Sequence, residues 1–170
     1  MSEGVPLARI EVNTTDDPEC GIAIALFVAG CPRRCVACQN PDLWDVSGFE
    51  VRPILLIQDE LERFFTEAEK LVDSVVFVGG DWSMYPVPYA ELAEWVQSRG
   101  LRTVLYTGET YEMLPESVRK VTDWVIDGIW MRDKPGIYPP STNQRVFHKG
   151  ELVDPAELPL YQHLASRAGN

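Results

Sequence analysis

Short apolar runs alternate along the chain with longer segments in which apolar residues recur every three or four positions. Residues 22–28 are apolar throughout, which is typical of a strand buried on both faces. Residues 74–78, 102–106 and 124–126 are further short runs rich in β-branched and aromatic side chains. These four segments predict strands of one sheet.

Helical patterns separate the predicted strands. One helix opens at Pro53 and carries an apolar stripe on one side. The stripe consists of Ile57, Leu61, Phe64, Ala68 and Leu71. A second helix is expected from about Pro88, with Gly100 as its stop, and a short one, interrupted near Pro115, follows it.

The alternation of strand and helix predicts an α/β fold with mainly parallel strands and right-handed crossovers. Four or five such units are too few to close an eight-fold barrel, so we expect an open partial (βα) barrel. Residues 7–12 are expected to add an edge strand, and the proline-rich residues 133–141 form an irregular connection. At 170 residues the chain is interpreted as one domain, with a core of about 20–150 and a short, partly helical tail of 151–170.

Three of the four cysteines, Cys31, Cys35 and Cys38, follow the first apolar run with the spacing C-x3-C-x2-C. A [4Fe–4S] cluster normally takes four thiolates. Three thiolates leave one iron with an open position, as a catalytic metal site requires. The alternatives are a zinc loop completed by a distant ligand, or three unrelated buried cysteines. The fourth cysteine, Cys20, is interpreted as a small buried apolar residue.

Candidate ligand-binding residues follow the other predicted strands. Gly79-Gly80-Asp81 comes after the second strand, Thr107-Gly108 after the third and Asp127-Gly128 after the fourth. Parallel α/β sheets bind ligands at the carboxyl ends of their strands. The sequence therefore predicts that these residues and the cysteines share one site.

The formal charge of −11 and the pI near 4.6 disfavour binding to nucleic acid or to an anionic membrane surface. No apolar run reaches membrane-spanning length, and the first residues lack the features of a secretory signal. We therefore expect a cytoplasmic protein with reduced cysteines and neither nucleic acid nor membrane as a partner.

The motifs, taken in order, resemble those of the radical S-adenosylmethionine (SAM) superfamily. The cysteine loop and Val78-Gly-Gly-Asp81 are typical of the superfamily as a whole. The stretches Cys38-Gln-Asn-Pro-Asp-Leu-Trp44 and Ser141-Thr-Asn-Gln-Arg-Val146 are similar to the branch that activates anaerobic (class III) ribonucleoside-triphosphate reductases. The resemblance runs from about residue 21 to residue 146.

This resemblance implies a partial barrel of the radical SAM type, one [4Fe–4S] cluster on the three cysteines, and SAM on the fourth iron. It implies no catalytic side chain beyond the cluster and SAM. The positions expected to contact SAM are Ala37, Gln39, Gly79, Gly80, Asp81 and Thr107, with Asp127 as a further candidate. Asp81 is expected to accept a hydrogen bond from the SAM ammonium group.

The resemblance also implies a reaction and its partners. Reductive cleavage of SAM yields a 5′-deoxyadenosyl radical, which takes a hydrogen from a glycine of a reductase subunit. A flavodoxin- or ferredoxin-type protein supplies the electron. Docking is expected at the face that carries the cysteine loop and residues 133–146, where the acidic chain meets a basic patch of the reductase. One alternative is an activase of another glycyl-radical enzyme, of the pyruvate formate-lyase type. Another is a non-enzymatic iron–sulfur or zinc protein, with Cys20 or His148 as fourth ligand.

Three positions differ from the pattern common in the superfamily. Ala23 lies in a stretch that commonly reads Gly-Pro-Gly and carries an arginine. Trp82 replaces a proline after the Gly-Gly-acid motif, and Gln39 replaces an aromatic residue or histidine beside the third cysteine. Without a ring at position 39, the cysteine loop lacks that surface for stacking an adenine.

Overall fold

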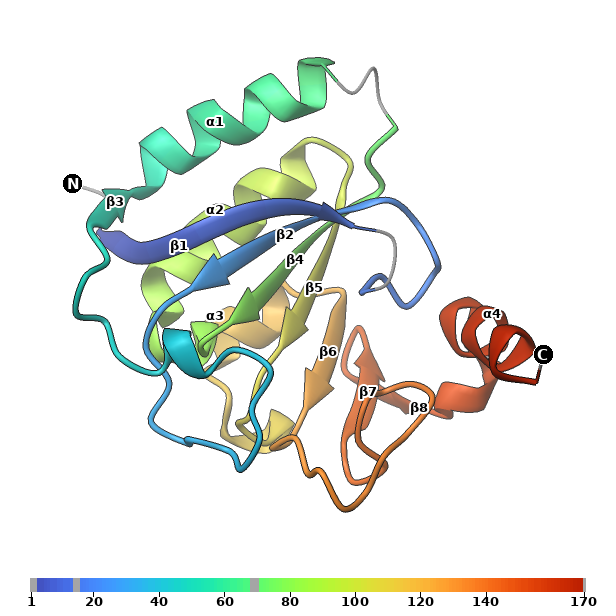
Figure 1. The fold of residues 1–170 in the computed structure, drawn as a ribbon. Helices are drawn as coiled ribbons and strands as arrows, with labels where there is room; N and C mark the ends of the chain where they lie inside the picture. The colour runs from blue at the N-terminus through green and yellow to red at the C-terminus, as the bar shows by residue number, and fades with distance from the viewer. Residues whose placement is uncertain (1–2, 14–15, 68–70, 170) are drawn as a thin grey trace.

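The computed structural model describes residues 3–13, 16–67 and 71–169. Their strands form one sheet in the order β3-β1-β2-β4-β5-β6-β7-β8 (Figure 1). The strands are β1 (Gly4–Asn13), β2 (Ala23–Val28), β3 (Val51–Pro53), β4 (Ser74–Gly79), β5 (Arg102–Tyr106), β6 (Trp124–Asp127), β7 (Arg145–His148) and β8 (Glu151–Val153). The α-helices are α1 (Ile54–Glu67), α2 (Pro86–Ser98), α3 (Glu116–Lys120) and α4 (Pro159–Ala168). Short 3-10 turns are η1 (Pro41–Leu43), η2 (Trp82–Met84), η3 (Tyr111–Met113) and η4 (Pro155–Glu157).

The sheet is parallel at its centre and antiparallel at both sides. Across the described ranges, the pairings β2–β4, β4–β5 and β5–β6 are parallel, and the four others are antiparallel. The expectation of a mainly parallel sheet therefore holds only for the central strands. The outermost strands β3 and β8 do not pair with each other, so the sheet is open as expected. Its interpretation as a partial barrel stays a prediction.

The hairpin β7–β8 was not expected from the sequence. Its two strands are joined by Lys149 and Gly150, which both have positive φ angles, +48° and +88°. Two such residues form the type I′ turn that matches the twist of a tight hairpin. A two-residue connection can only join antiparallel strands, so the chain cannot add another parallel strand here.

Most predicted elements are present, with corrections at their ends. The N-terminal strand exists as β1. Strand β3 pairs with its outer side only at Gly4–Pro6, so in the described chain residues 7–12 border the sheet as expected. Helix α1 ends at Glu67, so the predicted stripe does not extend to Leu71, which is 64% exposed. Ala68, another stripe position, lies outside the described residues. The tail contains strand β8 as well as the expected helix.

Each face of the sheet has its own apolar layer. Helices α1, α2 and α3 cover one face with a cluster that includes Ile57, Leu92 and Val118 (Figure 1). On the other face, Leu43 and Leu160 pack over the central strands. Helix α2 begins at Pro86, a position where the missing N–H of proline removes no helical hydrogen bond. None of the helices in the described chain is both long and apolar enough to cross a membrane.

The carboxyl ends of the parallel strands meet at one edge of the sheet. The cysteine loop follows β2, and Gly80-Asp81 follows β4. Thr107 follows β5, and Gly128 follows β6. The topology thus places the predicted site residues at a common edge.

Candidate metal and cofactor site

The cysteine loop is folded back against the sheet by backbone hydrogen bonds. The amide of Gly30 donates to the carbonyl of Leu43 at 2.8 Å, and the amide of Cys31 donates to the carbonyl of Trp44 at 3.1 Å. The side chain of Leu43 is fully buried and anchors η1 in the core. Arg34 and Ala37 have positive φ angles, +46° and +58°, which turn the chain between the cysteines.

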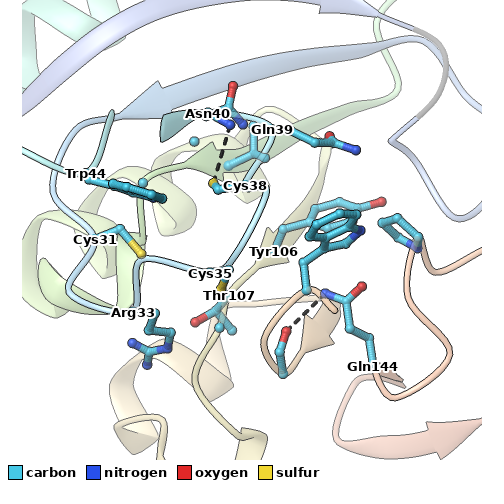
Figure 2. Close-up of a pocket in the computed structure, with 17 residues that line it drawn as sticks. Cys31, Arg33, Cys35, Cys38, Gln39, Asn40, Trp44, Tyr106, Thr107 and Gln144 are labelled. Carbon is cyan, nitrogen blue, oxygen red and sulfur yellow. Dashed lines mark hydrogen bonds between the residues drawn. The ribbon is translucent and has the colours of Figure 1, made fainter. Parts of the chain in front are cut away.

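The three cysteines surround one cavity at this edge (Figure 2). All three are free thiols of intermediate exposure, and burial raises the pKa of the Cys31 thiol. Fourteen further residues line the cavity: Arg33, Gln39, Asn40, Trp44, Val78, Gly79, Gly80, Tyr106, Thr107, Gly108, Gly128, Trp130, Pro140 and Gln144. The structure thus brings the cysteines together with Gly79, Gly80, Thr107, Gly108 and Gly128, whereas Asp81 and Asp127 do not line this cavity.

The three thiols around the cavity suit the thiolate ligation of an iron–sulfur cluster. The described residues contain no group of three His, Cys, Asp or Glu side chains close enough to hold one ion. The irons of a cubane occupy separate corners, and each normally takes one thiolate, so the thiols need not converge on one point. The amide of Asn40 donates to Sγ of Cys38 at 3.4 Å, and Nε1 of Trp44 is buried without a hydrogen-bond partner among the described residues. Such N–H groups stabilise thiolate and sulfide charge when a cluster is bound.

Among the described residues, neither Cys20 nor His148 is in reach of this cavity. Cys20 precedes β2, whereas the cysteine loop follows it, so six strand residues of about 3.3 Å each separate the two. Cys20 is also exposed, which contradicts its interpretation as a buried residue. His148 pairs with Trp124 at the amino end of β6 and stacks on its ring at 4.1 Å. Both candidates therefore lie near the amino ends of the parallel strands, opposite the cavity.

Gly79 and Gly80 allow the ends of β2 and β4 to approach closely. A Cβ atom on Gly80 would lie 2.6 Å from the carbonyl oxygen of Gly30, and Gly79 has a φ of +106°. The amide of Gly80 donates to the carbonyl of Val28 at 2.6 Å. The glycine pair thus has a packing role between the strands, and both residues also line the cavity.

Asp81 organises the strand-end loops from behind the cavity wall. Its side chain is 1% exposed and accepts hydrogen bonds from the hydroxyl of Thr107 at 2.8 Å and the amide of Gly108 at 3.1 Å. It also accepts from the amide of Ser83 at 3.0 Å. Thr107 lines the cavity and Asp81 does not. Direct contact of Asp81 with a ligand ammonium group stays a prediction.

Arg33 connects the cysteine loop with two other loops. Its Nη1 lies 3.5 Å from a carboxylate oxygen of Asp81, and its Nη2 donates to Glu109 at 3.0 Å. The side chain crosses Gly108 so closely that a Cβ atom there would lie 2.2 Å from Cδ of Arg33. Arg33 is therefore a partly buried link between loops, not a solvated charge.

Asp127 belongs to a structural ion-pair cluster. It is 1% exposed and accepts from the amide of Tyr111 at 2.7 Å and from Nε of Arg145 at 3.1 Å. Arg145 also donates to both carboxylate oxygens of Glu112, which lowers the pKa of Glu112 and raises that of Arg145. Asp127 does not line the cavity, although its neighbour Gly128 does.

A family model described as a 4Fe-4S single cluster domain matches residues 20–147. The chain belongs to this 4Fe-4S single cluster domain family. The chain is also 28% identical over 106 residues to the pyruvate formate-lyase-activating enzyme of Clostridium pasteurianum. That match covers 62% of this chain and 44% of the relative, so the chain spans less than half of that protein.

In this 4Fe-4S single cluster domain, several cavity residues were not among the expected contacts to SAM. They include Trp44, Tyr106, Trp130, Pro140 and Gln144. Conversely, Ala37 is exposed and does not line the cavity, whereas Gln39 does. Trp82 is fully buried and donates from Nε1 to the carbonyl of Leu26 at 2.9 Å, so its replacement of proline serves the core.

A groove adjoins the cavity of the domain and shares Arg33, Cys35 and Trp130 with it. Arg34 and Arg132 line the groove, together with exposed Val36 and one acid. The groove thus carries three arginines and one acid, so the expectation of an acidic docking face does not describe it.

Proposed function

We propose that this domain is a radical SAM activase that generates a glycyl radical on an anaerobic ribonucleoside-triphosphate reductase. Cys31, Cys35 and Cys38 would hold one [4Fe–4S] cluster. The observation that supports this most is the cavity at the carboxyl edge of the parallel strands, which three cysteines line without a fourth soft ligand. An iron left open in this way is available to an external ligand. The open sheet is compatible with a single partial-barrel domain of radical SAM type.

The cavity wall offers the groups that SAM requires. When bound and reduced, a cluster of this type supplies the electron that breaks a carbon–sulfur bond of the sulfonium. Gly79 and Gly80 bring backbone to the cavity, and the hydroxyl of Thr107 lies at its wall. Asp81 orients that hydroxyl by accepting its hydrogen bond. The side chain of Gln39 faces the same space, and the backbone of Ala37 stays a proposed contact (Figure 2).

The adjoining groove supports docking of a second polypeptide. It leads along Val36 and Ile129 to the cavity through Cys35, so a partner segment lying in it would reach the reacting centre. We propose that the reductase subunit docks here and that a flavodoxin- or ferredoxin-type protein supplies the electron. The free thiols are consistent with a reducing, cytoplasmic setting.

Two glycyl-radical partners have support from different observations. The stretch from Ser141 to Val146 favours the reductase. The likeness to a pyruvate formate-lyase-activating enzyme favours the lyase. Both partners would use the same cluster and SAM site, so the site geometry does not distinguish them.

The deciding experiment mixes the anaerobically reconstituted protein with SAM, a reductant and either a class III reductase subunit or a pyruvate formate-lyase. We expect a glycyl-radical EPR doublet in the reductase alone. Three arginines and one acid line the groove, so docking to an acidic patch of the partner should slow as salt rises. A doublet only in the lyase would transfer the assignment to that partner. Absence of both the doublet and SAM cleavage would refute an activase.

A further inference from the structure

The connection from Gly128 to Gln144 is fixed by the polar residues of the Ser-Thr-Asn-Gln-Arg stretch. The hydroxyl of Ser141 accepts from the amide of Met131 at 3.0 Å. Nδ2 of Asn143 donates to the carbonyl of Ile129 at 2.8 Å, and its Oδ1 accepts from the hydroxyl of Ser141. Arg145 pairs with Glu112 and Asp127. The side chains of Ser141, Asn143 and Arg145 are therefore all engaged in bonds within the protein.

Gln144 is the exception in this stretch. Its Nε2 donates to the carbonyl of Gly128 at 3.0 Å (Figure 2). A carbonyl only accepts, so this bond fixes which way the amide faces. The other end, Oε1, is buried and has no hydrogen-bond partner among the described residues. Gln144 lines the cavity, so this unpaired acceptor belongs to a cavity-lining side chain.

The cavity that Gln144 lines is also lined by flat, largely apolar side chains. Tyr106, Trp130 and Pro140 come from the end of β5 and from the fixed connection. The cysteine loop contributes no aromatic ring to the cavity beside the third cysteine, because position 39 is Gln and Ala37 lies outside the cavity. An aromatic surface combined with an amide edge is how proteins commonly bind purines.

We propose that Gln144 recognises the nucleoside half of SAM, with Oε1 accepting a hydrogen bond from it and Trp130 bordering the base. This inference rests on the proposed function. SAM carries four donors: the ammonium group, the 6-amino group of adenine and the 2′ and 3′ hydroxyls. The ammonium group belongs to the open iron in that function, so the partner of Gln144 is the 6-amino group or a ribose hydroxyl.

The buried state of Oε1 favours this contact. The oxygen is already shielded from water in the free protein, so its desolvation cost does not arise again when a ligand binds. A donor of the ligand would therefore gain a hydrogen bond with an acceptor that is otherwise unpaired. The ligand must part the wall enough for its donor to reach the oxygen. The loss of one such bond is expected to weaken binding roughly 5- to 100-fold.

The test measures equilibrium binding by calorimetry to the reconstituted, unreduced protein, which does not consume SAM. The ligands are SAM and three analogues, which lack the 6-amino group, the 2′ hydroxyl or the 3′ hydroxyl. Wild type and Gln144→Met are compared. We expect one analogue to bind the wild type at least 5-fold more weakly than SAM does, and we expect Gln144→Met to lose that preference.

A matched control separates recognition from loop stability. Asn143→Leu breaks the neighbouring bonds to Ile129 and Ser141 but keeps the acceptor of Gln144. It should lower the affinity for all ligands by one common factor and preserve the wild-type preference. If the preference survives in Gln144→Met, or if the wild type has none, the inference is wrong while the proposed function stands. If the wild type does not bind SAM at all, both are wrong.

Discussion

Arg33 and Asp81 belong to loops that follow different strands, yet a guanidinium nitrogen of Arg33 lies 3.5 Å from a carboxylate oxygen of Asp81. Asp81 in turn holds Thr107 and the amide of Gly108. The cysteine loop is thereby joined to the loops that form the opposite wall of the cavity. A change at either residue should affect both the cysteine loop and the proposed SAM site.

Replacement of Asp81 by Asn should destabilise the domain. An amide offers one acceptor oxygen, whereas the carboxylate uses both oxygens for Thr107, Gly108 and Ser83. We expect a loss of about 1–3 kcal/mol in the free energy of unfolding, measured with urea. Asp45→Asn, at an exposed turn, is the control and should change little. Equal stability of Asp81→Asn and wild type would contradict the hydrogen bonding described here.

Gly108→Ala should displace Arg33, because the new Cβ atom would overlap the Arg33 side chain at 2.2 Å. The cost in the free energy of unfolding is expected to be about 1–3 kcal/mol, typical of overpacking. In an Arg33→Ala background the same substitution should cost far less, which a double-mutant cycle measures. Strictly additive effects would show that the two residues do not meet.

Each of Cys31→Ala, Cys35→Ala and Cys38→Ala should abolish cluster assembly. All three cysteines line the cavity, and two thiolates hold a cubane poorly. Iron and sulfide analysis after anaerobic reconstitution should give about four of each per wild-type chain. Cys20→Ala is the control and should keep the cluster, since Cys20 is at the other edge. Cluster loss in that variant would revive the electron-carrier alternative.

The ion pair of Glu112 and Arg145 should make stability depend on acid pH. The hydrogen bonds from Arg145 lower the pKa of Glu112 below its usual 4.5 in the folded protein. A lowered folded pKa stabilises the protein above the unfolded pKa, and this contribution disappears as the pH falls through the folded value. Wild type should therefore exceed Glu112→Gln in stability at neutral pH, and the difference should shrink below about pH 4.5. Urea unfolding of both apoproteins across pH 3–7 measures this, and a difference independent of pH would contradict it.

Local patterns predicted the centre of this fold well. Strand β5 has the predicted bounds, Arg102–Tyr106, because its buried run is short and ends at a polar turn. The antiparallel hairpin β7–β8 was missed, since the strands at Arg145 and Glu151 are too short to show a period. The domain division was not tested by the fold and stays a prediction.

The site residues that act together and lie close to one another in the sequence could be predicted from it. The three cysteines carry their own spacing, and the structure brings them around one cavity. The ion-pair role of Asp127 depends on Arg145, which is distant in the sequence, so no local pattern could predict it. Trp130 and Pro140 lie in an irregular connection without periodicity, so only the fold shows that they line the cavity.

The outermost strands of the sheet have a consequence for association between copies of the protein. Strands β3 and β8 each contain three residues, and Pro53 in β3 has no N–H group to donate. Exposed strand edges are templates on which other chains add by backbone pairing, and short edges or proline weaken that template. Strand β3 pairs with β1 only at Gly4–Pro6, so it protects only that part of its side of the sheet. In the part of the chain that the structure describes, the β8 side and the segment covered by β3 are therefore poor starting points for edge-to-edge aggregation.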